Sequence, residues 1–303
     1  MFRNNKIIIT ICVSAILLCG LFLLVFSQDD SGNDKPPVVD PNSRIPGLFS
    51  QKDSSYVSWN DLIKEKRIQF GEDGTVSGGH PSLEGTLVLP DTAKVIAKGA
   101  FQGCSGLVSI DVPNSVTSIG ANAFKGCTGL QAIIIPEGVT SIEANTFENC
   151  TALKTITFNK KISFIGSGSF KNCTDLTYVV IPDAVTKVSA SAFEGCTGLK
   201  RAYLGASITY LDSKAFLNCT SLETVVFPMR LSYIGSKAFD GCTVLENVKY
   251  QSDYSKWHNT TIIASGNDAL TEGRITYNVN IALEKEAINA LIEEMLKAEA
   301  EKK

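Results

Sequence analysis

The chain has 303 residues, a formal net charge of −3 and a pI near 5.6. It lacks the basic surplus that nucleic-acid-binding domains carry, so nucleic acid is not expected as a partner. Only two histidines are present, His80 and His258, which disfavours histidine-based catalysis and metal binding.

The N-terminal segment predicts export. Arg3 and Lys6 precede residues 7–26, which contain no charged residue. This stretch is long enough to cross a hydrocarbon core of about 30 Å as a helix, and it exceeds the roughly 7–15 apolar residues of a secretory signal. The small Ser27 suits cleavage, so residues 1–27 are either a signal peptide or an uncleaved membrane anchor. Both place the remainder outside the cell, at the cell surface or in the periplasm.

The next segment, residues 28–54, is rich in Asp, Ser, Gly and Pro, as in "DKPPVVDPNSRIPG". Such a composition buries too little apolar surface to offset the entropy of ordering the chain. It is therefore predicted to be a disordered spacer that holds the rest of the chain away from the membrane.

A strict period of 23 residues dominates the remainder. The cysteines at this step are Cys104, Cys127, Cys150, Cys173, Cys196, Cys219 and Cys242. The phenylalanines are Phe101, Phe124, Phe147, Phe170, Phe193, Phe216 and Phe239. The leucines are Leu107, Leu130, Leu153, Leu176, Leu199, Leu222 and Leu245. A period in this range indicates a repeat architecture, in which each unit is one coil of a stack.

One period, "CTGLQAIIIPEGVTSIEANTFEN", predicts the path of a coil. Ile133 and Ile135 alternate with other residues as in a short strand, and Pro136 ends that strand because proline cannot donate to a ladder. Each cysteine follows glycine or asparagine, which tolerate positive φ best and so predict a left-handed turn residue in every coil. Stacked coils, with strands about 4.8 Å apart, would bury one continuous core and a phenylalanine spine.

The repeated cysteines have three interpretations. Neighbouring Cα atoms about 4.8 Å apart would fall within the disulfide range. Parallel side chains would hold the Cβ atoms slightly too far apart, however, and a 23-residue interval is unlike the close ligand pairs of zinc sites. We favour a small buried apolar plug in each coil, with disulfides and metal binding as the alternatives.

The pattern C-T-x-L-x-x-I-x-I-P-x-x-V-T-x-I-x-x-x-A-F-x-[GN] resembles the BspA-like (treponemal-type) leucine-rich repeat family over residues 84–250. The resemblance implies a β-rich solenoid, a right-handed stack of 23-residue coils. It also implies an N-terminal cap with short α elements (residues 55–83), a C-terminal cap (residues 251–279), and a secreted or surface-attached protein involved in adhesion. Asn159 and Gly205 replace the strand-ending proline, so their two coils are expected to turn differently.

The outward strand positions form the predicted binding surface, because a solenoid usually binds through its sheet face. The first column is Ser109, Ala132, Thr155, Tyr178, Arg201, Thr224 and Asn247. The second is Asp111, Ile134, Thr157, Val180, Tyr203, Val226 and Lys249. Tyr and Arg are enriched at binding hot spots, so the candidate site for a protein or glycan is Tyr178, Arg201, Tyr203, Val180 and Ile134. Alternatively, these residues are simply good strand formers.

Other singular residues favour structural roles. Trp59 and Trp257 fall in the two caps, where core packing is the preferred interpretation, and His258 has no acidic or cysteine partner nearby in the sequence. Three Asn-Cys-Thr triplets match a glycosylation acceptor only because asparagine fills the turn position. Asn259, followed by two threonines, is the better acceptor.

The last segment, residues 280–303, predicts an amphipathic helix. Its apolar face consists of Ile288, Leu291, Ile292 and Met295. The segment is short for a coiled coil, so packing on the last coil or a semi-detached tail is preferred, with a dimerisation or partner helix as the alternative.

The sequence shows no nucleophile elbow, phosphate loop or paired metal-ligand motif, so no enzyme activity, cofactor or metal is expected. The predicted function is a surface-exposed or secreted protein that binds another protein or a glycan. The alternative is a structural envelope or spacer protein without a specific ligand. If residues 7–26 are not cleaved, the membrane is a further partner.

Overall fold

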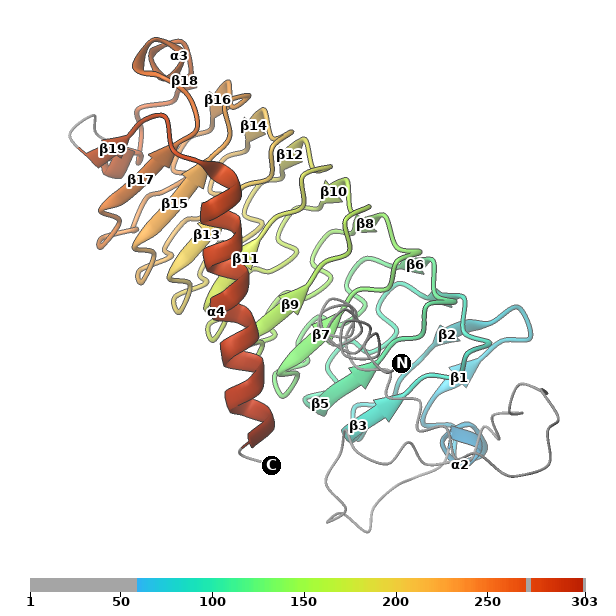
Figure 1. Cartoon of the computed structure of the whole chain (residues 1–303). Coiled ribbons are helices and arrows are strands. Elements are labelled where there is room, and N and C mark those ends of the chain that lie inside the picture. Colours follow the sequence, from blue (N-terminus) through green and yellow to red (C-terminus); the bar gives the residue numbers. More distant parts are fainter. Residues whose placement is uncertain (1–58, 271–273, 302–303) are drawn as a thin grey trace, which may run out of the picture. The chain divides into compact units, whose positions relative to one another are not determined.

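The computed structural model describes residues 59–270 and 274–301 (Figure 1). The chain divides into two compact units, Met1–Ser43 and Arg44–Lys303, and all described residues belong to the second. The predicted signal or anchor and the predicted spacer lie outside the described residues. Within the described part, no helix has the length and apolar character needed to cross a bilayer.

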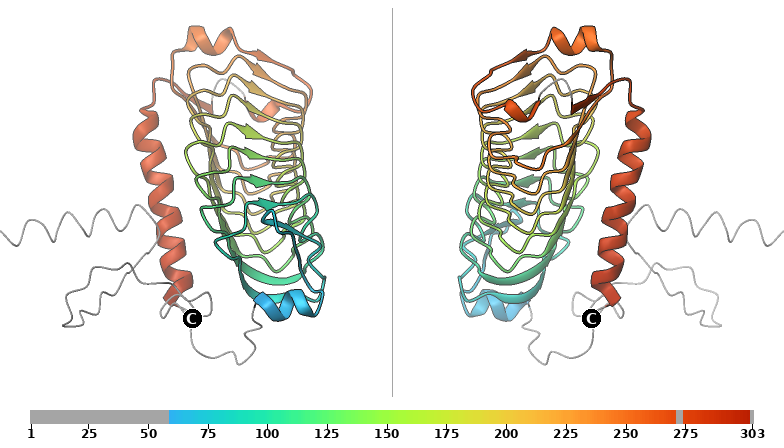
Figure 2. Two further views of the ribbon diagram at one scale, coloured as in Figure 1. Left: turned by 90° about the vertical axis from the view of Figure 1, so that its right-hand side faces the viewer. Right: turned by 90° about the vertical axis from the view of Figure 1, so that its left-hand side faces the viewer.

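The second unit is a β-solenoid in which each coil supplies one strand to each of two faces (Figures 1 and 2). Within the repeats, neighbouring strands are parallel and pair at a step of 23 residues, as Tyr178 does with Arg201 and Lys187 with Tyr210. The predicted leucine-rich repeat stack is therefore confirmed. Its coils follow the 23-residue period because each ladder requires equivalent residues at equal heights.

The long-strand face is made of two parallel sheets. The first contains β3 (Glu84–Val88), β5 (Gly106–Asp111), β7 (Ala132–Ile134) and β9 (Thr155–Thr157). The second contains β11 (Tyr178–Val180), β13 (Arg201–Tyr203), β15 (Thr224–Phe227), β17 (Asn247–Tyr250) and β19 (Ile275–Thr276). The ladder is interrupted between β9 and β11, so the face consists of two sheets, although the Thr177 N–H still donates to the Lys154 carbonyl at 3.4 Å beside the break.

The short-strand face is made of two-residue strands. Its longer sheet contains β8 (Ser141–Ile142), β10 (Phe164–Ile165), β12 (Lys187–Val188), β14 (Tyr210–Leu211), β16 (Tyr233–Ile234) and β18 (Thr261–Ile262). The other contains β4 (Val95–Ile96) and β6 (Ser118–Ile119), preceded by β1 (Gln69–Phe70) and β2 (Thr75–Ser77). Helix α2 (Trp59–Lys64) and the antiparallel pair β1–β2 lead into the stack, and Leu62 and Ile68 join its core.

The seven repeated phenylalanines form one continuous spine, as predicted. Their rings stack in pairs with centroids 5.1 to 5.4 Å apart, and all seven are almost completely buried. Burying an aromatic ring contributes on the order of 2–3 kcal/mol, and each stacked pair adds about 0.5–1.5 kcal/mol. The spine therefore couples every coil to its neighbours.

The seven repeated cysteines are buried and free, which confirms the predicted plug and excludes disulfides among them. Each also has a role that burial alone does not reveal. In six of them the thiol donates a hydrogen bond to the carbonyl of the phenylalanine in the preceding coil, as Cys127 does to Phe101 at 3.0 Å. Cys104 has no such coil before it, and its thiol reaches the carbonyl of His80 at 3.4 Å instead.

The residue before each cysteine adopts positive φ in all seven coils, as predicted. These residues are Gly103, Gly126, Asn149, Asn172, Gly195, Asn218 and Gly241. Asparagine serves as well as glycine here because it tolerates this backbone region. The side chains of Asn149 and Asn172 also hydrogen bond to each other at 2.9 Å, which links two coils on the outside of the turn.

The two coils that lack the proline do not turn differently, so that expectation was wrong. The N–H three residues further on donates to the carbonyl of Asn159 and of Gly205, as it does to that of Pro136. Each replacement instead makes its own contact with the preceding coil. The buried amide of Asn159 donates to the carbonyls of Pro136 and Val139 in the preceding coil, at 2.5 and 2.9 Å. Gly205 lies so close to the preceding coil that a Cβ atom would stand 2.2 Å from the carbonyl oxygen of Pro182. One departure adds hydrogen bonds and the other permits a close approach.

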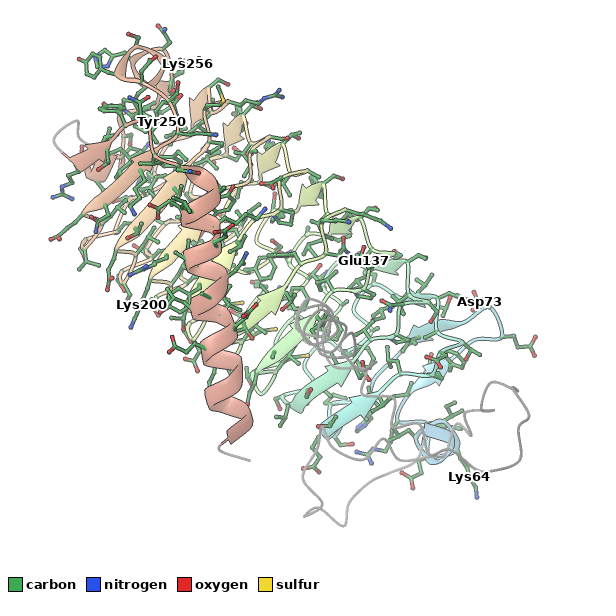
Figure 3. All side chains as sticks on the ribbon, viewed as in Figure 1. Lys64, Asp73, Glu137, Lys200, Tyr250 and Lys256 are labelled. Carbon is green, nitrogen blue, oxygen red and sulfur yellow. The ribbon has the colours of Figure 1, made fainter. Side chains whose placement is uncertain are left out.

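The stack ends in a segment that extends both ladders one step further, through β18 and β19. This segment also contains α3 (Tyr254–His258) and the 3₁₀ turn η1 (Asp268–Leu270). Trp257 of α3 is buried and packs on Phe227 and Tyr250, with ring centroids 5.6 and 5.2 Å apart. Tyr250 is labelled in Figure 3. It closes the end of the core, in agreement with the packing role preferred for it. Helix α4 (Ile281–Glu301) follows.

Candidate functional site

The outward columns of the long-strand face lie where the 23-residue step predicts. Tyr178, Arg201, Thr224 and Asn247 are successive register partners, and so are Val180, Tyr203, Val226 and Lys249. Side chains alternate along a strand, so these residues face away from the core that the intervening Val179 and Ala202 enter. The structure thus brings four of the five candidate residues together on β11 and β13.

Helix α4 covers this part of the face, which the sequence analysis did not predict. It runs across the strands, beside the long-strand face in both views of Figure 2. Ile288, on the side of α4 that meets the sheet, forms a small hydrophobic cluster with Tyr203 and Val226. Tyr178 and Val180 of the sheet pack against that cluster, as do Ile292 of α4 and Val279, which precedes α4. Tyr203 is only 2% exposed as a result.

Two ion pairs flank the cluster. Lys249 Nζ lies 2.6 Å from Glu284 Oε1, and Lys285 Nζ lies 2.6 Å from Asp183 Oδ2. Lys285 also stands 5.5 Å from the centroid of the Tyr203 ring. Lys249 on β17 and Asp183 in the turn after β11 thus each meet the opposite charge on the helix.

Asp183 is the polar centre of this contact. It accepts the Ala206 N–H at 3.1 Å and the Tyr203 hydroxyl at 3.5 Å, in addition to Lys285. Burial alone would raise its pKa, but the hydrogen bonds from Lys285 and Ala206 and the lysine charge lower the pKa on balance. Burial and the neighbouring carboxylate raise the pKa of Tyr203, so its phenol stays neutral.

On the other half of the long-strand face, which we call the open half, the second outward column is exposed, although Thr155 of the first column is buried. Ile134 on β7, the fifth candidate, is 63% exposed, and Val88 on β3 is 40% exposed. Asp111 and Thr157, beside Ile134 in the same column, are also exposed. Arg201 is half-buried at the edge of the covered half. The five candidates therefore divide between the two halves: Ile134 lies on the open half and the other four on the covered half.

A third outward column lies on the short-strand face, and the sequence analysis did not identify it. It consists of Ser141, Phe164, Lys187, Tyr210, Tyr233 and Thr261. The rings of Tyr210 and Tyr233 stack with centroids 4.2 Å apart, and Lys187 Nζ lies 4.8 Å from the Tyr210 centroid. Lys187 also pairs with Asp212 at 2.8 Å. Stepping by 23 along the second strand of each coil would have found this column from Ser141 to Tyr233, but not Thr261, which pairs with Tyr233 in the closing segment.

The remaining candidates fit structural roles. The ring of His258 stacks on Tyr254 within α3, and its Nε2 lies 3.0 Å from the Tyr254 hydroxyl. Asn259 is the C-cap residue of the same helix. Among the described residues, no three histidine, cysteine or acidic side chains gather in an arrangement that could hold a metal ion.

A family model described as "BspA type Leucine rich repeat region" matches the chain in six copies, over residues 82–200 and 161–267. These limits enclose both halves of the long-strand face up to β17. No curated protein matches the chain in sequence.

Several solved structures are similar. A leucine-rich repeat protein from T. pallidum is 28% identical with a TM-score of 0.53, and the match covers 59% of this chain and 86% of that one. One from Eubacterium ventriosum is also 28% identical with a TM-score of 0.53, over 57% of this chain and 48% of that one. A leucine rich cell surface protein from Faecalibacterium prausnitzii is 26% identical over 59% of this chain, with a TM-score of 0.44, and the match spans 62% of its length.

Proposed function

Because the chain belongs to the BspA-type leucine-rich repeat family, which is typical of bacterial surface proteins, we propose that it works outside the cell and binds another protein or a glycan there. It does so as a binding module, without catalysing a reaction. The uncharged residues 7–26 support export, as a signal peptide or as an anchor.

The observation that carries the proposal is the contrast between the repeated core residues of the coils and the outward positions of the strands. The inward phenylalanine, cysteine and leucine are the same in all seven coils, because stacking demands it. The outward positions of the second column on the long-strand face hold six residue types in seven coils, with only valine occurring twice: Asp111, Ile134, Thr157, Val180, Tyr203, Val226 and Lys249. Stacking does not require this variety, whereas a surface that recognises one particular ligand does.

We place the binding site on the long-strand face, with Ile134 and Arg201 reaching the ligand first. Tyr178, Val180 and Tyr203 belong to the same surface and lie under or beside α4. Aromatic and arginine side chains are the residue types that dominate binding energy at interfaces. The open half supplies an apolar contact at Ile134, and the covered half supplies the aromatic ones.

The test is attachment of bacteria that display the full chain to immobilised extracellular-matrix proteins and to mucin. Ile134→Asp combined with Arg201→Glu is expected to reduce attachment at least tenfold, because both place a negative charge on the binding face. Phe164→Asp is the matched control: Phe164 is also exposed (42%) and apolar, but it lies on the short-strand face. Attachment should be unchanged in that control.

Two results would overturn this assignment. Equal attachment of the long-strand variant and the wild type, with both folded, would reject the face. No attachment of the wild type to any of these surfaces would favour the structural alternative, a spacer without a specific ligand.

The location has a test of its own. Sequencing the N-terminus of the mature protein distinguishes the two forms of export. A chain that begins at Gln28 has lost a signal peptide, and one that begins at Met1 or Phe2 and fractionates with the membrane is anchored. A chain with an intact N-terminus in the cytoplasmic fraction would contradict the proposal.

A further inference from the structure

The covered half of the long-strand face has the features of a surface for an amphipathic helix. Tyr203, Val226 and Ile288 form a hydrophobic cluster that is separate from the main core of the stack. Two of its three members are sheet residues at outward positions, where Tyr178 and Val180 of the coils pack beside them and Ile288 of α4 completes the cluster. The cluster exists because a helix lies on it, which makes it a contact surface rather than part of the core.

The way α4 fits this surface defines the chemistry of a ligand. Ile288 and Ile292 are one turn apart and both reach the cluster, while Glu284 and Lys285 precede Ile288 by four and three residues and meet Lys249 and Asp183. Positions four residues apart share one face of a helix. The surface therefore selects the pattern Glu-Lys-x-x-apolar-x-x-x-apolar.

Among the described side chains of α4, residues 282–294, those on the outer side have no comparable contacts. Leu283 is 61% exposed, and Glu286, Ala287, Ala290 and Glu293 are exposed as well. The two ion pairs on the inner side are themselves partly open to solvent, with side-chain exposures between 26% and 50%, so they hold the helix only weakly. The backbone of Val279 and Asn278 ties the start of the helix to the last coil, through the carbonyls of Tyr250 and Ser252. The helix is thus anchored at its start and held over its described side chains by one apolar cluster and two partly exposed ion pairs.

We propose that the covered half of the long-strand face binds an amphipathic helix of a partner protein, and that α4 occupies this site in the free chain. The proposal rests on the proposed function, because it narrows the ligand of the same face to a protein helix with the pattern above. The partner competes with α4, which is lifted when the partner helix binds. Lys249 and Asp183 then form ion pairs with the partner helix in place of those that they form with α4.

The test uses a fluorescein-labelled peptide with the sequence of residues 279–301 as the probe, and fluorescence anisotropy of the full chain as the readout. Ile288→Asp with Ile292→Asp releases α4 without touching the sheet. This variant is expected to bind the peptide at least tenfold more tightly than the wild type, whose site is filled. Leu283→Asp, on the outer side of the same helix, is the matched control and should bind as weakly as the wild type.

A charge exchange tests the contact itself. In the released variant, Lys249→Glu should weaken binding of the wild-type peptide, and a peptide carrying Glu284→Lys should restore it. Glu284→Lys with Lys285→Glu in the chain is a second release variant that leaves every apolar side chain in place. This charge-exchange variant replaces the variant with Ile288→Asp and Ile292→Asp if circular dichroism shows the latter to be unfolded.

Three outcomes would overturn the proposal: a folded released variant that does not bind the peptide, a wild type that binds it as tightly, or a binding loss that the charge exchange does not rescue. A wild-type dimer with exchanged α4 helices would also overturn it, since a second copy would then be the occupant. Peptide binding without attachment to matrix or mucin would reject only the proposed adhesion, and attachment without peptide binding would reject only the helix site.

Discussion

Cys196 shows how one small side chain joins two coils. Its thiol donates to the carbonyl of Phe170 at 3.1 Å, and the same carbonyl accepts the N–H of Cys173 within its own coil, also at 3.1 Å. Sulfur is larger than a hydroxyl oxygen and fills a buried apolar site while it makes this contact. Cysteine therefore combines volume with a weak donor, which neither alanine nor valine provides.

At this scale we expect Cys196→Ala to lower the free energy of unfolding by about 1–2 kcal/mol, through the lost volume and the lost donor. Urea denaturation followed by circular dichroism measures the change. Thr197→Ala is the control, because Thr197 is its exposed neighbour, and it should stay within about 0.5 kcal/mol of the wild type. A Cys196→Ala chain as stable as the wild type would refute the role of the thiol.

The thiols also predict how stability depends on pH. Burial raises the pKa of Cys196 and of Cys150 to about 12 and that of Cys104 to about 11, from an ordinary value of 9.0. A raised pKa favours the folded state below pH 9, and this contribution is lost as the pH rises toward the folded pKa, because only the unfolded thiols release their protons there.

Urea midpoints should therefore fall between pH 9 and about pH 11. Cys196→Ala should decline less steeply than the wild type, by about 1.4 kcal/mol per pH unit, the value for one proton. Parallel declines of the two chains would show that the thiol of Cys196 is not responsible.

At the scale of an element, Gly103 and Gly205 each lie in a turn that favours glycine, but for different reasons. Gly103 needs positive φ, at +77°, and a Cβ there would meet nothing within 4 Å. Gly205 instead needs space, because a Cβ would stand 2.2 Å from a backbone oxygen that cannot move without its coil.

We accordingly expect Gly205→Ala to destabilise the chain by about 1–3 kcal/mol, as overpacking does. Gly103→Asn should change stability by no more than about 0.5 kcal/mol, since asparagine already occupies the equivalent turn in three coils. Thermal unfolding of the two variants checks the order. If Gly103→Asn proves the more damaging, backbone φ is the stricter requirement at these turns and space is the lesser one.

For the whole solenoid, the strict period makes each coil a separable unit that interacts with the coils before and after it. Deletion of residues 128–150 removes one complete coil and joins Cys127 to Thr151, which has the same residue type as the Thr128 it replaces. The shortened chain should fold with a lower unfolding midpoint. Deletion of residues 128–149, one residue fewer, should not fold cooperatively, because it shifts every later ladder out of register. Circular dichroism and urea denaturation compare the two deletions.

Much of this architecture could be predicted because the same residue types recur at the same spacing in seven coils. The phenylalanine spine and the positive-φ turn before each cysteine both follow from residue types at one spacing. The acceptor of each thiol could not be predicted, since burial is visible in a sequence but the backbone group facing a side chain is not. The hydrogen bonds of the Asn159 amide could not be predicted for the same reason.

The candidate site was predicted in part. The register confirms which residues point outward, so Tyr178, Arg201 and Tyr203 do lie together. What covers them was not predicted, because an amphipathic pattern such as Ile288 and Ile292 shows that a helix has an apolar side without showing what that side meets. Whether these residues bind a ligand stays a prediction.

The attachment of α4 to the last coil has an evolutionary consequence. The helix begins where Asn278 and Val279 bond to the final turn of the stack, so its reach is measured in coils from that end. Gene duplication near the N-terminal end would lengthen the open surface and leave the sheltered residues as they are. Duplication near the C-terminal end would instead place different side chains beneath α4. Duplications at the N-terminal end could therefore enlarge the open half of the long-strand face while the covered half stays the same.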